Sequence, residues 1–182
     1  RDYFLIVYHP ETNKNSGDIS ELFKLMDDYQ DYRMVIIYPN SDIMSREIIS
    51  QIENFKSKHS DNVLLVKSTA RTNYLGLMKH CTVFLGNSSS GIIEMPSFYH
   101  PIINIGDRQK GRIRSKSTID TDLDYVNLKL AVEKSFSDDF QRELPTMHNP
   151  YQGYRPSALI VDKLKEIIPT MTIEKKFMDL KL

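Results

Sequence analysis

The chain has 182 residues, 24 Lys plus Arg against 24 Asp plus Glu, and one cysteine. This length fits one domain that buries its core without metal or disulfide support. The balanced charge excludes a field that would hold the whole chain on nucleic acid or on an anionic membrane, so any anion site is local. No apolar run reaches the ~20 residues of a membrane helix, and Cys81 has no partner for an internal disulfide. We therefore expect a soluble, cytoplasmic protein with no nucleic-acid or membrane partner.

The chain opens at Arg1 instead of a methionine, and an apolar run begins two residues later. A processed start would look the same, and so would a cut between two domains. We interpret the chain as the C-terminal half of a longer protein.

Apolar runs of strand length alternate with segments of helical periodicity, a pattern that predicts a parallel α/β sheet. The predicted strands are Tyr3 to Tyr8, Arg33 to Tyr38, Asn62 to Val66, Thr82 to Leu85 and Pro101 to Ile105. The crossovers between them are short, so a Rossmann-like, doubly wound sheet is the economical topology.

Apolar residues at helical spacing lie between these strands. The first helix is marked by Ile19, Leu22, Phe23, Leu25 and Met26, and the second by Ile43, Ile48, Ile49, Ile52 and Phe55. Further helices are predicted over Asn73 to Cys81, Gly91 to Phe98, Leu123 to Phe136, Asp138 to Leu144 and Ser157 to Ile168, with a stop or bend at Pro96. Residues 1–168 are assigned to one lobe and residues 169–182 to a tail that packs on a missing N-terminal lobe.

Polar residues follow each predicted strand, at the sheet edge where open parallel sheets bind ligands. The segments are His9 to Thr12, Pro39 to Asp42, Lys67 to Thr69, Ser88 to Glu94 and Asp107 to Arg112. This edge is therefore the expected binding site.

Two of these segments favour a diphosphate ligand. Ser88, Ser89 and Ser90 offer hydroxyls and backbone amides at a helix start, which suit a phosphate, although serine also caps helices without any ligand. Glu94 could bind ribose hydroxyls or could simply be stabilised by the helix dipole. Arg108 has the planar fork that suits an oxyanion, although its charged loop could also be merely solvated.

His9 ends the first strand, where a structural hydrogen bond and a catalytic role both remain open. His59, His100 and His148 show no metal-ligand spacing, and the signatures of phosphate loops, dinucleotide binding and nucleophile elbows are absent. We expect no metal and no cofactor, and we expect the chemistry to be completed outside this chain.

The sequence resembles the UDP-N-acetylglucosamine 2-epimerase family, and within it the hydrolysing branch that supplies N-acetylmannosamine for sialic acid synthesis. The resemblance rests on Phe84 to Phe98, Asn104 to Arg112, His9 to Thr12, Tyr38 to Asn40 and His148 to Tyr151. It implies the C-terminal lobe of a two-lobe B-type glycosyltransferase (GT-B) fold, with most acid/base carboxylates in the other lobe.

The resemblance also implies roles for individual residues. Ser88, Ser89 and Ser90 would hold the diphosphate of a UDP-sugar, Glu94 the ribose, Arg108 and Asn40 the nucleotide, the Thr69 backbone the uracil, and His9 would act in catalysis. The implied reaction eliminates UDP from UDP-N-acetylglucosamine and then adds water, with addition at C2 from the opposite sense, to release N-acetylmannosamine. We expect this lobe alone to bind UDP weakly without turnover, and the intact protein to be a homo-oligomer.

Three alternatives remain. A glycosyltransferase lobe would share the fold and the ribose-binding carboxylate, although the loop Gly106 to Arg112 argues against it. A hydrolysing 2-epimerase for a related sugar, such as UDP-diacetylbacillosamine, would look similar. The third alternative is a nucleotide-sugar sensor without catalytic activity.

Overall fold

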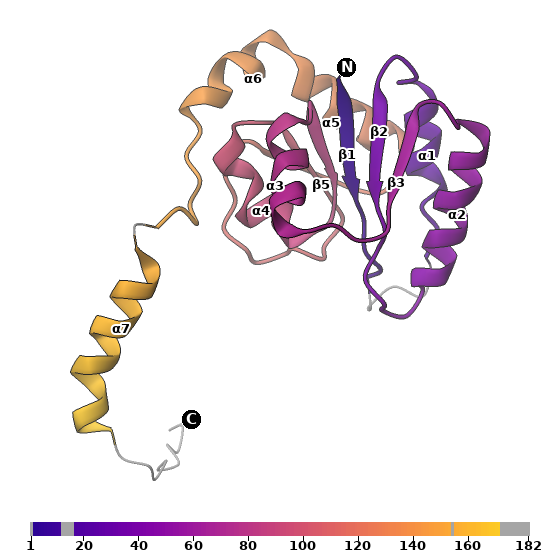
Figure 1. Ribbon diagram of the computed structural model, residues 1–182. Helices are drawn as coiled ribbons and strands as arrows, with labels where there is room; N and C mark the ends of the chain where they lie inside the picture. Colours follow the sequence, from indigo (N-terminus) through magenta and orange to yellow (C-terminus); the bar gives the residue numbers. More distant parts are fainter. Residues whose placement is uncertain (1, 12–16, 154, 172–182) are drawn as a thin grey trace, which may run out of the picture. The chain divides into compact units, whose positions relative to one another are not determined.

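A parallel sheet of six strands forms the centre of the protein, in a computed structural model that describes residues 2–11, 17–153 and 155–171. The strands are β1 (Tyr3–Val7), β2 (Arg33–Ile37), β3 (Val63–Val66), β4 (Val83–Gly86), β5 (Ile102–Ile105) and β6 (Thr118–Thr121). They lie in the order β3-β2-β1-β4-β5-β6, and each neighbouring pair is parallel (Figure 1). The direction of winding reverses between β1 and β4, which confirms the predicted Rossmann-like, doubly wound sheet.

Helices cover both faces of the sheet, because successive side chains of a strand point to opposite faces. In β1, Phe4 and Ile6 belong to one core cluster, whereas Leu5 and Val7 belong to another. The first cluster is covered by α1 (Ser20–Asp27), α2 (Ser45–Lys58) and α5 (Tyr125–Phe136). The second face carries α3 (Arg71–His80), α4 (Ser89–Ile93) and the 3-10 helix η1 (Met95–Phe98). The chain then continues through α6 (Asp138–Glu143) and the 3-10 helix η2 (Leu144–Thr146).

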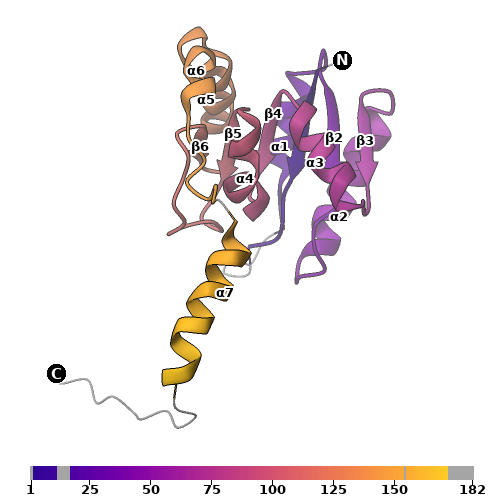
Figure 2. The same ribbon diagram turned by 60° about the vertical axis from the view of Figure 1, so that its left-hand side comes forward.

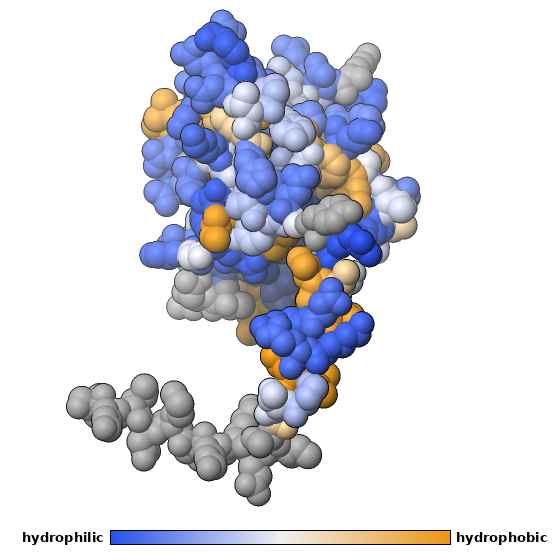
Figure 3. Space-filling model, turned by 90° about the vertical axis from the view of Figure 1, so that its left-hand side faces the viewer, coloured by the Kyte–Doolittle hydropathy of each residue, from blue (hydrophilic) through white to orange (hydrophobic). Residues whose placement is uncertain are grey.

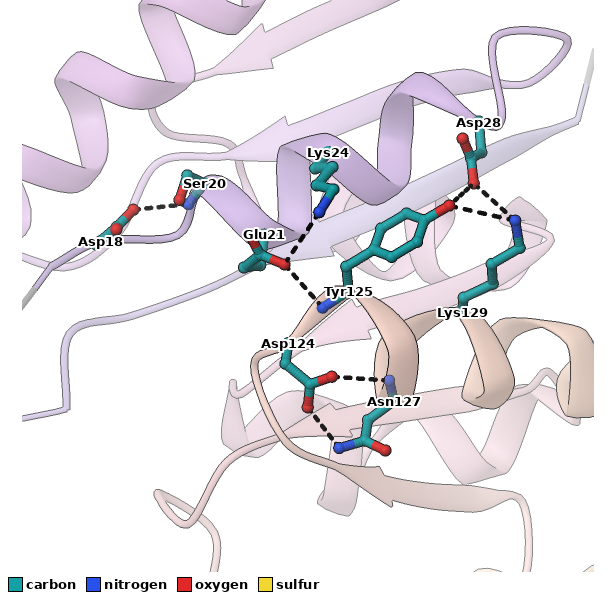
Figure 4. A network of polar contacts seen from close by, with 9 residues as sticks. All are labelled: Asp18, Ser20, Glu21, Lys24, Asp28, Asp124, Tyr125, Asn127 and Lys129. Atoms are coloured by element: carbon teal, nitrogen blue, oxygen red, sulfur yellow. Dashed lines mark hydrogen bonds and ion pairs between the residues drawn. The ribbon is translucent and has the colours of Figure 1, made fainter.

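Polar contacts join α1 to α5 (Figure 4). Glu21 accepts a hydrogen bond from the backbone N–H of Tyr125 at 3.0 Å, and Asp28 accepts one from the Tyr125 hydroxyl at 2.6 Å. Lys129 Nζ lies 3.0 Å from the same Asp28 carboxylate. These bonds hold the helix after β6 against the first helix of the chain.

The sequence predicts five strands, and the structure adds β6 at the edge of the sheet beside β5 (Figure 2). The strand reads Thr-Ile-Asp-Thr, in which Ile119 is buried and Asp120 is exposed. An edge strand pairs on one side only and tolerates charge, so a search for apolar runs passes over it.

The predicted helices are present with shifted boundaries. The helices α3 and α4 begin two residues earlier than predicted, at Arg71 and Ser89, and the bend expected at Pro96 falls within η1. Ile43 is predicted on the apolar face of α2, but it precedes that helix and its side chain is 79% exposed. That part of the prediction is wrong because periodicity alone does not mark where a helix begins.

Residues 152–182 form a second compact unit, described as far as residue 171. The unit contains α7 (Pro156–Ile167) and the 3-10 helix η3 (Ile168–Thr170), and Figure 3 shows hydrophobic and hydrophilic side chains together on this helix. The exposed large apolar residues of the unit, within its described part, are Leu159, Ile160, Val161, Leu164, Ile168 and Met171. The assignment of residues 1–168 to a lobe and 169–182 to a tail stays a prediction, because residues 172–182 lie outside the described part. Among the described residues, no helix is long and apolar enough to cross a membrane.

Candidate functional site

The strand order places the switch point of the sheet between β1 and β4, where doubly wound folds open a ligand crevice. Gly86 ends β4 with a φ of +147°, and a Cβ at this position would lie 2.1 Å from the carbonyl oxygen of Val7. Only glycine allows so close an approach of the two backbones. The backbone N–H of Asn87 consequently donates to the same Val7 oxygen at 3.2 Å.

Asn87 joins the loops that follow β1 and β4. Its Oδ1 accepts a hydrogen bond from the backbone N–H of His9 at 2.7 Å, and its Nδ2 donates to the carbonyl oxygen of His9 at 2.8 Å. Asn87 is fully buried, so no water competes for these bonds. The backbone of His9 is therefore fixed from two sides.

The imidazole of His9 is half-buried and meets the loop after β2. Its Nδ1 accepts a hydrogen bond from the backbone N–H of Asn40 at 3.1 Å, and the Asn40 side chain donates to Asp42 at 2.5 Å. Burial, reinforced by the charge of Arg108, lowers the pKa of His9 from 6.5 to about 4, against the opposing effect of Asp42. His9 is therefore a neutral imidazole at neutral pH.

This neutrality is directly testable by titration. We expect His9 to stay uncharged down to pH 5 and to protonate with a midpoint at about pH 4, followed by NMR of the imidazole nitrogens. Because the folded pKa is depressed, the unfolded chain takes up the proton first as pH falls. The contribution of His9 to stability is thus complete above about pH 6.5 and is lost between there and about pH 4. A midpoint near 6.5 would contradict the packing described here.

The loop after β5 reaches the same place. Arg108 Nη1 and Gln109 Nε2 both donate to the carbonyl oxygen of Asn87, at 3.3 and 2.8 Å. Gln109 is only 2% exposed and anchors the loop, whereas Arg108 is exposed and keeps most of its donors for a ligand. The guanidinium of Arg108 is thus bound to Asn87, the residue that directly precedes Ser88.

The three serines are not equivalent. Ser88 caps α4, and its Oγ lies 3.0 Å from Ser90 Oγ, which in turn lies 2.6 Å from the hydroxyl of Tyr74 on α3. Ser89 is half-buried, and its hydroxyl makes no hydrogen bond to the described residues. All three remain predicted diphosphate ligands, with Ser89 the one whose hydroxyl is free to donate.

Glu94 lies at the end of α4 and pairs with a residue that the sequence did not single out. Its Oε1 is 2.9 Å from Arg71 Nη2, at the start of α3, and its side chain is 25% exposed. Thr69 lies two residues before Arg71, but within the described part of the chain its side chain makes no hydrogen bond to the other predicted residues. The contact between the β3–α3 connection and Glu94 is therefore made by Arg71, the first residue of α3.

The contacts gather the predicted residues into three sets. One joins His9 and Arg108 through Asn87, with Asn40 bound to the His9 ring. The second joins Ser88 and Ser90 to Tyr74, and the third pairs Glu94 with Arg71. Within the described part of the chain, the side chains of Ser89 and Thr69 join none of these sets. Thr12 lies outside the described residues. Sequence reasoning missed Asn87, Gln109, Tyr74 and Arg71. The sequence could have pointed to Asn87 and Gln109, because both stand inside the motifs that carry the resemblance. Tyr74 and Arg71 could not be found in this way, because they meet Ser90 and Glu94 only through the packing of α3.

The fold is a Rossmann-like lobe of the GT-B class, with its polar loops gathered at the switch point. Residues 1–165 match the model of the UDP-N-acetylglucosamine 2-epimerase family. The chain belongs to this family.

Relatives and solved structures agree with this placement. The chain is 35% identical over 184 residues to the GDP/UDP-N,N'-diacetylbacillosamine 2-epimerase (hydrolyzing) of Campylobacter jejuni, covering 99% of this chain and 47% of that protein. It is 33% identical to the polysialic acid biosynthesis protein P7 of Escherichia coli, covering 87% and 40%. S. aureus MnaA, solved with UDP, has the same fold, with a TM-score of 0.72, 19% identity, and coverage of 98% and 48%. The chain thus spans about half the length of the proteins it matches.

Proposed function

We propose that this chain forms the UDP-binding wall of a hydrolysing UDP-N-acetylglucosamine 2-epimerase. One observation carries the proposal: Asn87, directly before the serine triplet, binds both Arg108 and His9. Its backbone carbonyl accepts a hydrogen bond from Arg108, and its side chain accepts one from the His9 backbone. A cation, a free hydroxyl and a neutral imidazole at one switch point suit a nucleoside diphosphate.

The proposed chemistry places these groups on the leaving side of the sugar. Breaking the anomeric C–O bond leaves its electron pair on UDP, while a base removes the C2 proton and a 2-acetamidoglucal forms. Water then supplies the hydroxyl at C1, and C2 receives a proton from the opposite sense, which releases N-acetylmannosamine. Arg108, which the Asn87 carbonyl holds in place before the reaction, stabilises the charge that develops on the diphosphate, and the free hydroxyl of Ser89 donates to it.

The role of Arg108 can be isolated by comparing two ligands. We expect Arg108→Ala to weaken binding of UDP about 10-fold or more and to leave binding of uridine nearly unchanged, because its partner is phosphate. Isothermal titration calorimetry measures both affinities. Arg112→Ala, which removes an exposed arginine of the same loop, is the matched control and should change neither. Equal losses for UDP and uridine would contradict the assignment.

The sugar is a separate question, and the 35% identity to the diacetylbacillosamine 2-epimerase favours a second candidate substrate, UDP-N,N'-diacetylbacillosamine. Product analysis with each UDP-sugar on the full-length protein separates the two, because water is the only co-reactant in both cases. A product that appears only with an added acceptor sugar would instead indicate a transferase. For this chain alone we propose UDP binding without turnover.

A further inference from the structure

Asn87 has a bonding pattern that phosphate binding by the serines does not explain. Its Oδ1 and Nδ2 bind the two backbone groups of His9, as one strand binds another. Its backbone N–H donates to Val7, and its carbonyl accepts from both Arg108 and Gln109. A carbonyl oxygen has two lone pairs, so the backbone N–H and the carbonyl of this buried residue are fully used, and its side-chain amide both accepts and donates a hydrogen bond. They are used to connect the loops after β1, β4 and β5.

The ring of His9 is held separately, by a hydrogen bond from the loop after β2. Because Nδ1 accepts the Asn40 N–H, the proton of a neutral imidazole must reside on Nε2. The charged groups that act on the ring are Arg108, which opposes a proton on Nδ1, and Asp42, which favours one. A ligand therefore meets Nε2–H, which donates a hydrogen bond.

We propose that Asn87 is the positioning residue of the site: it holds the backbone of His9 and the side chain of Arg108 at a fixed separation, and thereby keeps the His9 ring against the Asn40 N–H, where it acts as a neutral Nε2–H donor. The proposal rests on the UDP-binding function proposed above. His9 then donates a hydrogen bond to the substrate and does not remove the C2 proton. The base for that step belongs to another group of the intact protein.

The first test needs no variant. In the chain labelled with ¹⁵N, the two His9 ring nitrogens report the tautomer directly by long-range proton–nitrogen NMR. We expect a single Nε2–H form between pH 5 and 8, because the lowered pKa keeps the ring neutral and Nδ1 accepts the Asn40 N–H. A protonated Nδ1 in this range would overturn the proposal, whether or not UDP binds.

The second test uses Asn87→Ser, which removes the two-sided bridge. We expect both tautomers to appear and UDP affinity to fall about 10-fold, the equivalent of one hydrogen bond to a charged group. In the background of His9→Gln with Arg108→Ala, the same substitution should change affinity less than about 3-fold, because it acts through those two residues. Equal losses in both backgrounds would show a merely structural role and overturn the proposal.

The matched control is Asn62→Ser. Asn62 also binds a distant backbone carbonyl, that of Gln30 at 2.7 Å, but it precedes β3 and lies at the opposite end of the strands. It should leave the His9 tautomer and UDP affinity unchanged. If the unaltered chain fails to bind UDP, the proposed function fails, while the NMR spectra of the chain and of Asn87→Ser still decide whether Asn87 positions His9.

Discussion

Gly86→Ala is expected to lower the free energy of unfolding by about 2 to 6 kcal/mol, the sum of overpacking and of backbone strain at about 1 to 3 kcal/mol each. A Cβ at this residue would lie 2.1 Å from the Val7 carbonyl oxygen and 2.6 Å from its carbonyl carbon, and the backbone φ is +147°. Backbone cannot swing aside as the end of a side chain can. A loss of this size is a large fraction of the stability of an ordinary domain.

Urea denaturation followed by circular dichroism measures this loss. Gly76→Ala is the control, because among the described residues no atom outside its own stretch of α3 lies within 4 Å of the Cβ that would be added there. That substitution should raise the free energy of unfolding by about 0.5 to 1 kcal/mol through helix propensity. If Gly86→Ala unfolds at the urea concentration of the parent chain, β1 and β4 do not approach as described.

Glu94→Gln should lower the affinity for UDP about 10- to 100-fold with the fold intact. The neutral amide keeps the shape of the carboxylate but loses the charge-assisted hydrogen bonds that we propose Glu94 makes to ribose hydroxyls, which together would contribute roughly 1.5 to 3 kcal/mol. Calorimetric titration with UDP gives the value. An affinity equal to that of the parent chain would remove Glu94 from the proposed site.

Arg71→Ala separates a direct role of Glu94 from an effect of its ion pair. The Arg71 side chain is 74% exposed, and exposed pairs contribute about 0.2 to 1 kcal/mol, so UDP affinity should fall less than about 5-fold. If Arg71→Ala reproduces the full loss seen with Glu94→Gln, then Arg71 is the ligand-binding group and Glu94 only orients it.

The fold could be predicted because the strands that build it are apolar on both faces. In β1 every residue from Phe4 to Val7 is buried, and such runs stand out in a sequence without any knowledge of their neighbours. The edge strand β6 escaped prediction for the converse reason, since Asp120 faces solvent on a strand paired along one side. Apolar composition marks the strands that are buried, and an edge strand such as β6 is less buried than a central strand such as β1.

The sequence by itself determined the fold class, the family and the sheet edge that carries the polar loops, because these depend on local patterns and on the motifs from Gly86 to Arg112. Only the tertiary structure decided which groups meet. Asn87 binds His9 from 78 residues away, and Arg71 reaches Glu94 across two helices. Such contacts depend on how β1 and β4 lie side by side and how α3 packs on α4. No spacing along the chain encodes that geometry, because it arises from the burial of the whole core.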